Sequence, residues 1–259
     1  MPTINADGCP LNVEVEGRDD APVLMLSNSL GTNLHMWDPQ MPEFTKHFRV
    51  VRYDRRGHGK SGAPAGPYSF ERFGRDILAI INALKIGKMN WCGLSMGGMD
   101  GQWLGANAGD RIEKLVLANT NYYYADKSPW ADRIKFVLEK GPAGFVDTNM
   151  VRWFTKGFIE RAPKEIERMK EMFLASNREG YAACVGAIRD MDFRATNPGI
   201  TAPTLVIVGT QDPATPPAYG EEIARQIKGA KIASLDASHI SNVEQPAAFT
   251  KVVLDFLKA

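Results

Sequence analysis

The stretch Gly93-Leu94-Ser95-Met96-Gly97 decides how this chain can fold. It follows a short apolar segment, residues 89–93, that predicts a strand, and it precedes residues 96–108, which predict a helix. A serine flanked by glycines at such a junction sits on a sharp turn, because the small neighbours let the backbone bend and leave the Ser95 hydroxyl exposed. The stretch therefore predicts a nucleophilic serine, which needs partners from elsewhere in the chain.

The composition is that of an ordinary globular chain. Of 259 residues, 44% are hydrophobic and 24% are charged, so apolar side chains are ample for a core. The formal net charge is only +1, so the overall charge does not favour binding to nucleic acid or to an anionic membrane. No run approaches the roughly 18 apolar residues of a membrane-spanning helix, and the N-terminus lacks the regions of a secretory signal. The three widely spaced cysteines argue against a disulfide framework, so we expect a reducing cytoplasm.

Strand and helix signals alternate along most of the chain. Helix signals include Ser69 as an N-cap before an apolar stripe over residues 70–84, and proline-marked starts at Pro216-Pro217 and Pro246. Near-continuous apolar runs predict strands at residues 22–26, 48–53, 89–93, 115–118, 204–208 and 231–235. This alternation predicts an α/β fold with a mostly parallel central sheet flanked by helices.

One interval, residues 121–194, breaks this rhythm because it holds helical patterns and no good strand candidate. We therefore predict a core domain made of residues 1–120 and 195–259, with residues 121–194 inserted as a helical cap, or lid. The large apolar side chains of the cap are expected either to line a pocket or to pack the cap onto the core. They are Trp130, Trp153, Phe154, Phe158, Met169, Met172 and Phe173.

Ser95 needs a base, because a serine hydroxyl is a poor nucleophile near neutral pH. Of the four histidines, His239 follows the last predicted strand, at the carboxyl edge of the sheet where Ser95 also emerges. Asp212 follows the preceding strand in the same way and is the expected carboxylate that orients the imidazole. The order along the chain, Ser95 then Asp212 then His239, is one of the known orders of serine triads and differs from the others. The competing carboxylates are Asp236 and, more weakly, Asp126 and Asp54.

The tetrahedral intermediate of such a reaction needs two hydrogen-bond donors for its oxyanion. One is expected to be the backbone N–H of Met96, directly after the nucleophile. The other is expected from the loop at residues 27–32 after an early strand, with the backbone N–H of Leu30 as the candidate.

Two patterns near residue 57 imitate nucleotide-binding motifs. Residues 57–62 match G-x-G-x-x-G, but that motif must open a helix, and the proline-containing residues 63–67 follow instead. A phosphate-binding loop ending at Lys60-Ser61 would need glycine where Asp54 stands. Four dispersed histidines without a Cys/His/carboxylate cluster argue against a metal site. We expect these glycines to shape a turn, and we expect neither a cofactor nor a metal.

Taken together, these segments resemble the α/β-hydrolase family over essentially the whole chain. The turn at residues 53–61 is similar to the arginine–glycine loop of that family. Residues 27–32, 36–40, 92–98 and 101–107 resemble more closely the 3-oxoadipate enol-lactonases. Asn28-Ser29, where many α/β-hydrolases carry His-Gly, matches the lactonases. The resemblance implies an α/β-hydrolase fold with a helical cap.

The resemblance also implies a reaction. Ser95 would open the ring of 3-oxoadipate enol-lactone through an acyl-enzyme, with His239 as base and acid, in the β-ketoadipate pathway of aromatic-compound catabolism. The expected partner is thus a small anionic lactone, and the number of subunits is left open. Its carboxylate needs a cation or several donors when desolvated. The candidate substrate contacts are Arg133, Trp130 and Trp153, with Arg189 and Lys127 as alternative cations.

The same triad serves other activities, so rival interpretations stay open. They are a general carboxylesterase, another lactonase, a carbon–carbon bond hydrolase, a perhydrolase, a receptor that binds a ligand with little turnover, and a pure scaffold in which Ser95 is inert. A dehalogenase is disfavoured because its nucleophile is an aspartate where this chain has Ser95.

Overall fold

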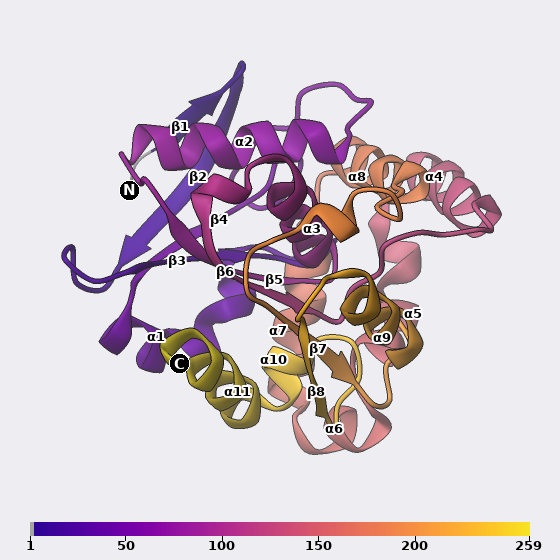
Figure 1. Cartoon of the computed structure of the whole chain (residues 1–259). Coiled ribbons are helices and arrows are strands. Elements are labelled where there is room, and N and C mark those ends of the chain that lie inside the picture. Colours follow the sequence, from indigo (N-terminus) through magenta and orange to yellow (C-terminus); the bar gives the residue numbers. More distant parts are fainter. Residues whose placement is uncertain (1–2) are drawn as a thin grey trace.

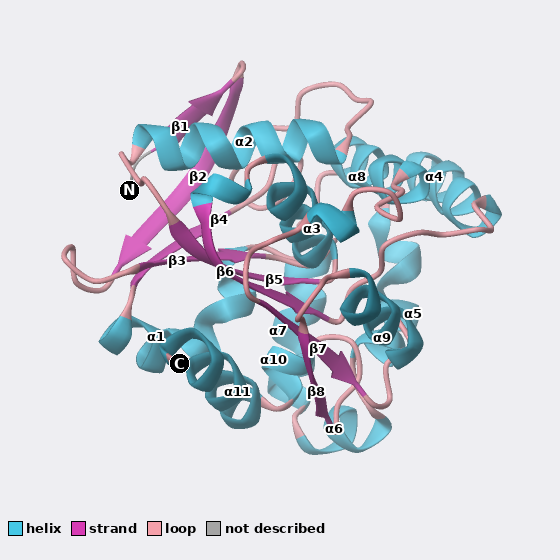
Figure 2. Ribbon diagram, viewed as in Figure 1, coloured by secondary structure: helices cyan, strands magenta, loops and turns pink. Residues whose placement is uncertain are grey.

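An eight-stranded sheet runs through the molecule, with helices on both sides (Figures 1 and 2). The computed structural model describes residues 3–259. The strand order is β1-β2-β4-β3-β5-β6-β7-β8; β2 is antiparallel to β1 and β4, and all other neighbours are parallel. The strands are β1 (Thr3–Ala6), β2 (Cys9–Glu16), β3 (Val23–Ser27), β4 (Arg49–Tyr53), β5 (Met89–Leu94), β6 (Ile112–Ala118), β7 (Thr204–Gly209) and β8 (Lys231–Leu235). The predicted mostly parallel sheet is confirmed.

Helices cover the two faces of this sheet. The α-helices are α1 (Met41–His47), α2 (Phe70–Ala83), α3 (Met96–Asn107), α4 (Ser128–Lys140), α5 (Val146–Trp153), α6 (Lys156–Arg161), α7 (Pro163–Leu174), α8 (Arg178–Asp190), α9 (Pro217–Gln226), α10 (Ser241–Glu244) and α11 (Pro246–Lys258). Short 3₁₀ helices are η1 (Leu34–Gln40), η2 (Gly109–Arg111), η3 (Pro142–Phe145) and η4 (Asn197–Gly199). Helices α1 and α11 lie on one face of the sheet and α2 and α3 on the other (Figure 1).

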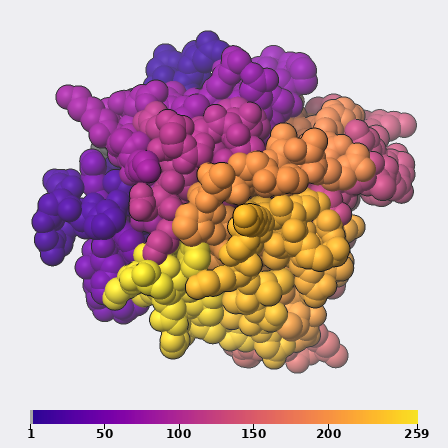
Figure 3. All heavy atoms as spheres, in the orientation of Figure 1, coloured from indigo at the N-terminus to yellow at the C-terminus, as the bar shows by residue number. Residues whose placement is uncertain are grey.

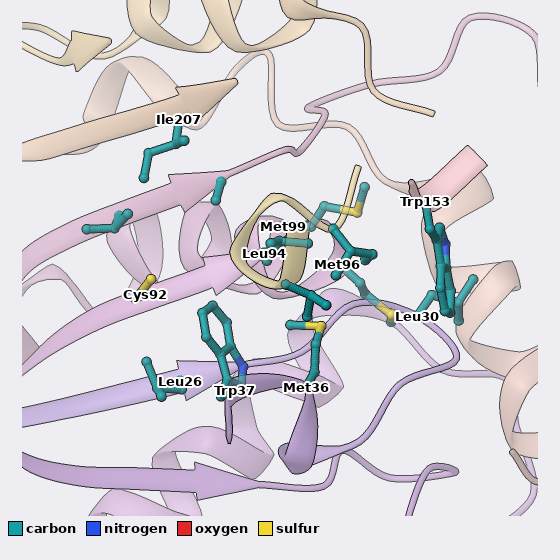
Figure 4. Packing of buried hydrophobic residues seen from close by; sticks show 14 of the residues in the cluster. Leu26, Leu30, Met36, Trp37, Cys92, Leu94, Met96, Met99, Trp153 and Ile207 are labelled. Carbon is teal, nitrogen blue, oxygen red and sulfur yellow. The ribbon is translucent and has the colours of Figure 1, made fainter. Parts of the chain in front are cut away.

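The core has two layers because side chains alternate along each strand. Leu24 and Leu26 of β3 join the cluster that includes α1 and α11, whereas Met25 between them joins the cluster that includes α2 and α9. Figure 4 shows part of the first cluster, where Leu26 of β3 and Cys92 of β5 pack near Trp37 of η1. The sheet is thus buried on both faces, which accounts for the continuous apolar runs of its parallel strands.

The two N-terminal strands were not predicted from the sequence. In β2 only alternate side chains are apolar, and a proline, Pro10, lies within the strand, as is typical of a strand near a sheet edge. One predicted strand starts earlier in the structure: β6 begins at Ile112 rather than at residue 115. The apolar pattern missed its first residues because they include the polar Glu113 and Lys114. The C-terminal segment lies at the surface (yellow in Figure 3), and Nζ of Lys114 in β6 donates to the Leu257 carbonyl of α11 at 3.1 Å.

Helices α4 to α8 occupy the interval between β6 and β7, where the sequence predicted an insertion. Tyr123 and Asp192 form an isolated β-bridge that brings the two ends of this segment together. The domain boundaries at residues 121 and 194 stay a prediction, and we call residues 121–194 the cap below. In the described range, residues 3–259, there is no helix long and apolar enough to cross a membrane.

Candidate active site

Ser95 lies on the turn between β5 and α3 with a backbone conformation that is rare for a serine. Its φ is 58° and its ψ is −114°, outside the regions that side chains readily adopt. Gly97 allows the turn to sit against the neighbouring strand, since a Cβ there would lie 2.1 Å from the Ser27 carbonyl oxygen. Tight packing of this kind holds the strained turn in place and presents the Ser95 hydroxyl at the carboxyl edge of the sheet.

The structure brings Ser95, His239 and Asp212 together in one hydrogen-bonded line. Oγ of Ser95 lies 2.8 Å from Nε2 of His239, and Nδ1 of His239 lies 2.8 Å from Oδ2 of Asp212. Asp212 lies in the loop after β7, and His239 lies in the loop between β8 and α10. All three residues are buried. Three carboxyl-edge loops therefore converge on one point, in a geometry suited to proton transfer from the hydroxyl.

The Asp212 carboxylate is held by several donors besides His239. Oδ1 accepts from the backbone N–H groups of Ala214 and Thr215 at 2.8 and 2.9 Å, and Oδ2 accepts from the Thr215 hydroxyl at 2.7 Å. Burial acts to raise the pKa of Asp212, but the charge of His239 and these hydrogen bonds outweigh it and leave the pKa below its usual value. Asp212 therefore stays ionised beside the imidazole.

The competing carboxylates lie elsewhere. Asp236 is exposed and accepts from Nε2 of Gln211 at 2.7 Å. Asp126 accepts from the backbone N–H of Ser128 at 2.9 Å at the start of α4. Asp54 is buried under η1, where it accepts from the Leu34 N–H at 2.8 Å. None of the three is hydrogen-bonded to His239 within the described part of the chain.

Asn119 also belongs to this site, although the sequence analysis missed it. Its Nδ2 donates to Oδ2 of Asp212 at 3.1 Å and to the Ser238 carbonyl at 3.2 Å, while its Oδ1 accepts from the Ser241 hydroxyl at 2.6 Å. Asn119 directly follows β6, so its place at a carboxyl strand end was a signal that could have identified it.

The two expected oxyanion donors lie in the same region. Met96 is the first residue of α3, so its N–H has no partner inside the helix. In the part of the chain that the structure describes, the N–H of Leu30 is likewise bonded to no protein acceptor. Figure 4 shows both side chains at the same end of the sheet, and Leu30 shares a cavity wall with Ser95.

A cavity between the cap and the core opens onto Ser95. The core contributes polar groups from the loops described above, and the cap contributes arginine and aromatic side chains. The lining residues are Ser29, Leu30, Ser95, Met99, Tyr124, Trp130, Arg133, Asn149, Arg152, Trp153, Tyr181, Ile188, Ala214, Thr215 and His239. The cavity thus combines a nucleophile, two cations and several aromatic rings.

Arg133 is held at the cavity by neutral partners. Its Nε donates to Oη of Tyr181 at 2.9 Å and its Nη2 to Oδ1 of Asn149 at 2.8 Å, and its guanidinium lies 4.6 Å from the Phe145 ring centroid. No carboxylate lies within ion-pair distance of it among residues 3–259. Its positive charge is therefore available to an anionic ligand.

The other predicted cap residues divide into two groups. Trp130 and Trp153 line the cavity and also contact the large apolar cluster. The residues of that cluster that do not line the cavity are Phe154, Phe158, Met169, Met172 and Phe173. The alternative cations are away from the cavity and face Asp190: Arg189 pairs with it at 2.6 Å and Lys127 at 3.9 Å.

The sequence analysis missed about half of the cavity lining, which includes Tyr124, Asn149, Arg152 and Tyr181. Arg152 stands at the end of α5, and its guanidinium has no protein hydrogen-bond acceptor within residues 3–259. No local signal marks such residues, because an arginine on a helix is ordinarily a solvated side chain. Among the described residues, no group of three His, Cys, Asp or Glu side chains is arranged to hold a metal ion.

Comparison with known proteins gives a consistent result. The family model described as alpha/beta hydrolase fold matches residues 22–246. Two proteins of Acinetobacter baylyi are similar over nearly their whole length: 3-oxoadipate enol-lactonase 2, at 40% identity over 99% of this chain and 96% of the relative, and 3-oxoadipate enol-lactonase 1, at 34% identity over 98% and 96%. The crystal structure of the enol-lactonase from Burkholderia xenovorans LB400 superposes with a TM-score of 0.98 and 45% identity, covering 100% of both chains.

Proposed function

This chain belongs to the alpha/beta hydrolase family, and we propose that it hydrolyses 3-oxoadipate enol-lactone to 3-oxoadipate. The observation that carries the proposal is the line of hydrogen bonds from Ser95 through His239 to Asp212, at 2.8 Å each, at the base of a cavity that also holds Arg133. The similarity to two enol-lactonases over nearly the whole chain supports the substrate.

In the proposed first step, Oγ of Ser95 attacks the carbonyl carbon of the lactone ring while Nε2 of His239 takes the hydroxyl proton. Asp212 holds Nδ1 of the imidazole and stabilises the imidazolium that forms. The backbone N–H groups of Leu30 and Met96 donate to the oxyanion, and one such donor is worth about 3 kcal/mol of transition-state stabilisation. Neither amide is hydrogen-bonded to a protein acceptor within residues 3–259, so both can donate to the oxyanion.

Collapse of the tetrahedral intermediate breaks the ring C–O bond. The departing enol oxygen takes the proton from His239, which leaves an acyl group on Ser95 and an enol at the other end of the same molecule. Tautomerisation of the enol to a ketone removes the tethered nucleophile, so ring closure cannot readily reverse the step. Water, deprotonated by His239, then attacks the acyl group and releases the second carboxylate.

The acetate arm of this lactone carries a carboxylate that must be paired when the cavity excludes water. We assign that contact to Arg133, because neutral partners orient its guanidinium and leave its charge uncompensated. Trp130 and Trp153 contribute apolar surface to the cavity wall. The pathway we infer is the β-ketoadipate route of aromatic catabolism, and the three free, buried cysteines suit a reducing cytoplasm.

A coupled assay that generates the enol-lactone in situ tests the proposal, with p-nitrophenyl acetate as a neutral ester for comparison. We expect efficient turnover of the lactone by the wild-type protein, and a loss of nearly all activity in Ser95→Ala with an unchanged melting temperature. Turnover of the neutral ester alone would indicate a general esterase. Negligible turnover of both, with Ser95 inert to a fluorophosphonate probe, would refute an acyl-transfer function.

A further inference from the structure

His58 is a buried histidine that the proposed reaction does not use. It lies in the glycine-containing turn after β4, and only 1% of its surface is exposed. Its Nε2 accepts a hydrogen bond of 2.9 Å from the backbone N–H of Gly31. Gly31 directly follows Leu30, so this bond joins the turn to the loop that carries a proposed oxyanion donor.

Three successive peptide groups of that loop are each held by a separate partner. The Asn28 carbonyl accepts from Nη2 of Arg55 at 3.1 Å. The Ser29 carbonyl accepts from the Thr32 hydroxyl at 2.8 Å. The N–H of Gly31 donates to His58. The N–H of Leu30 lies between these fixed groups and is left without a protein acceptor in residues 3–259, as an oxyanion donor must be.

The hydrogen bond from the Gly31 N–H to His58 restrains the residue of the loop with the greatest backbone freedom. Gly31 has a φ of 76°, and a Cβ there would lie 2.6 Å from the Phe173 ring of the cap. A glycine in this conformation has no side chain to fix it and a large conformational freedom to lose. The Phe173 and Tyr181 rings pack against the Gly31 Cα, and the imidazole of His58 accepts from the Gly31 N–H.

The turn that carries the imidazole is closed by several internal hydrogen bonds. The backbone N–H of His58 donates to the Arg55 carbonyl at 3.0 Å, and the backbone N–H of Gly57 donates to the Gly62 carbonyl at 2.8 Å, which closes the turn. Asp54 accepts from the Lys60 N–H at 2.9 Å in the same turn. A side chain on a turn with so many internal hydrogen bonds can occupy only a narrow range of positions, as a positioning residue must.

An acceptor nitrogen must be unprotonated, and the surroundings of His58 keep it so. Burial and the charge of Arg55 lower the pKa of His58 to about 3, against a hydrogen bond to the backbone of Arg56. The groups that face it from the cap helix α8 are the Tyr181 ring, at a centroid distance of 6.2 Å, and the Cys184 thiol, 3.9 Å from Nδ1. Neither is a carboxylate, and burial raises the pKa of both, so neither supplies a negative charge that would stabilise an imidazolium.

We propose that His58 is a positioning residue that holds the Leu30–Gly31 segment so that the Leu30 N–H points at the oxyanion formed on the carbonyl attacked by Ser95. This inference rests on the proposed acyl-transfer function but not on the identity of the lactone. It assigns a role to a turn whose glycine pattern imitates a nucleotide-binding motif. His58 touches neither substrate nor nucleophile and acts through the loop.

Three variants and a control test the proposal. His58→Gln places Oε1 where it can accept from Gly31, His58→Asn carries an amide too short to reach it, and His58→Leu removes the acceptor. The exposed His35→Gln is the matched control. We measure kcat and KM on the lactone, the melting temperature, and the rate at which a fluorophosphonate labels Ser95.

We expect kcat and the labelling rate to fall about 10- to 100-fold in His58→Leu and His58→Asn, since losing an oxyanion donor outright costs about 100- to 1,000-fold. KM is expected to stay within about threefold, and His58→Gln to recover most of kcat. A folded His58→Leu or His58→Asn with wild-type kcat and labelling rate would overturn the proposal, as would equal losses in all three variants. If the wild-type protein labels with fluorophosphonate but does not turn over the lactone, the substrate assignment fails while this test still stands.

Discussion

Replacing Arg133 with methionine is the sharpest test of how the cavity selects an anionic substrate. The substitution keeps an unbranched apolar stem and removes a guanidinium that has no carboxylate partner in the described chain. A hydrogen bond to a charged group contributes about 1.5–3 kcal/mol, and about 1.4 kcal/mol is tenfold in binding. We therefore expect KM for the acidic lactone to rise about 10- to 150-fold.

The assay must separate this loss of binding from indirect damage to the site. Removing Arg133 also deprives Oη of Tyr181 and Oδ1 of Asn149 of their donor, which can disturb the cap. A neutral ester such as p-nitrophenyl acetate, measured on the same preparation, reports that disturbance without the charge. Arg189→Met is the matched control, because that arginine is paired with Asp190 outside the cavity.

The expected pattern is a large rise in KM on the lactone, a change of less than about threefold on the ester, and no effect of Arg189→Met on either. Equal losses on both substrates would show that Arg133 supports the cap and does not bind the carboxylate. A lactone KM that moved as much in Arg189→Met would place the anion contact elsewhere.

Three further results are expected. Asp212→Asn should lower kcat about 10,000-fold with little change in KM, because an amide can donate to Nδ1 and stabilise the wrong imidazole tautomer; steady-state kinetics measures this. Leu30→Ala should keep kcat within a few-fold, since the proposed donor is its backbone N–H; a loss as large as that of an oxyanion donor would contradict that assignment. The pKa of His58 is about 3 in the folded chain, against an ordinary value of 6.5. Between these values the unfolded chain binds a proton that the folded chain does not. The free energy of unfolding therefore falls as the pH drops below about 6.5, by at most about 1.4 kcal/mol per pH unit. Melting curves between pH 7 and pH 4 should therefore show a shallower decline for His58→Gln than for the wild-type protein, and parallel declines would refute the assignment.

The parts of the site that the sequence predicted share one physical feature. Ser95, Asp212 and His239 each follow closely on a parallel strand, and parallel strands bring their carboxyl ends to one edge of a sheet. Local apolar runs were enough to identify those strands, so a long-range convergence could be inferred from short-range patterns. Asn119 follows β6 by the same logic and could have been found.

The cap obeys no such rule. Its helices alternate apolar and polar residues at helical spacing, which predicts that a helix exists but not which neighbour its faces meet. Arg133 and Arg189 both stand on cap helices; the packing of α4 against α8 brings Arg133 to Tyr181, whereas Arg189 pairs with its chain neighbour Asp190. Arg152 was missed for the same reason, since nothing in the local pattern marks it as a cavity residue.

The turn at residues 54–62 shows how one pattern of glycines can serve two unrelated purposes. In a dinucleotide site the glycines let the backbone approach a pyrophosphate. Here Gly57 lets the core approach the cap, because a Cβ on it would lie 2.6 Å from Cα of Gly180 at the start of α8. The next residue, His58, bonds the Gly31 amide, and Tyr181, the residue after Gly180, bonds Arg133. The contact between two backbones thus fixes the spacing between the group proposed to bind the substrate carboxylate and the loop proposed to stabilise the oxyanion. A substrate of different length between its carboxylate and its ester carbonyl would not satisfy both.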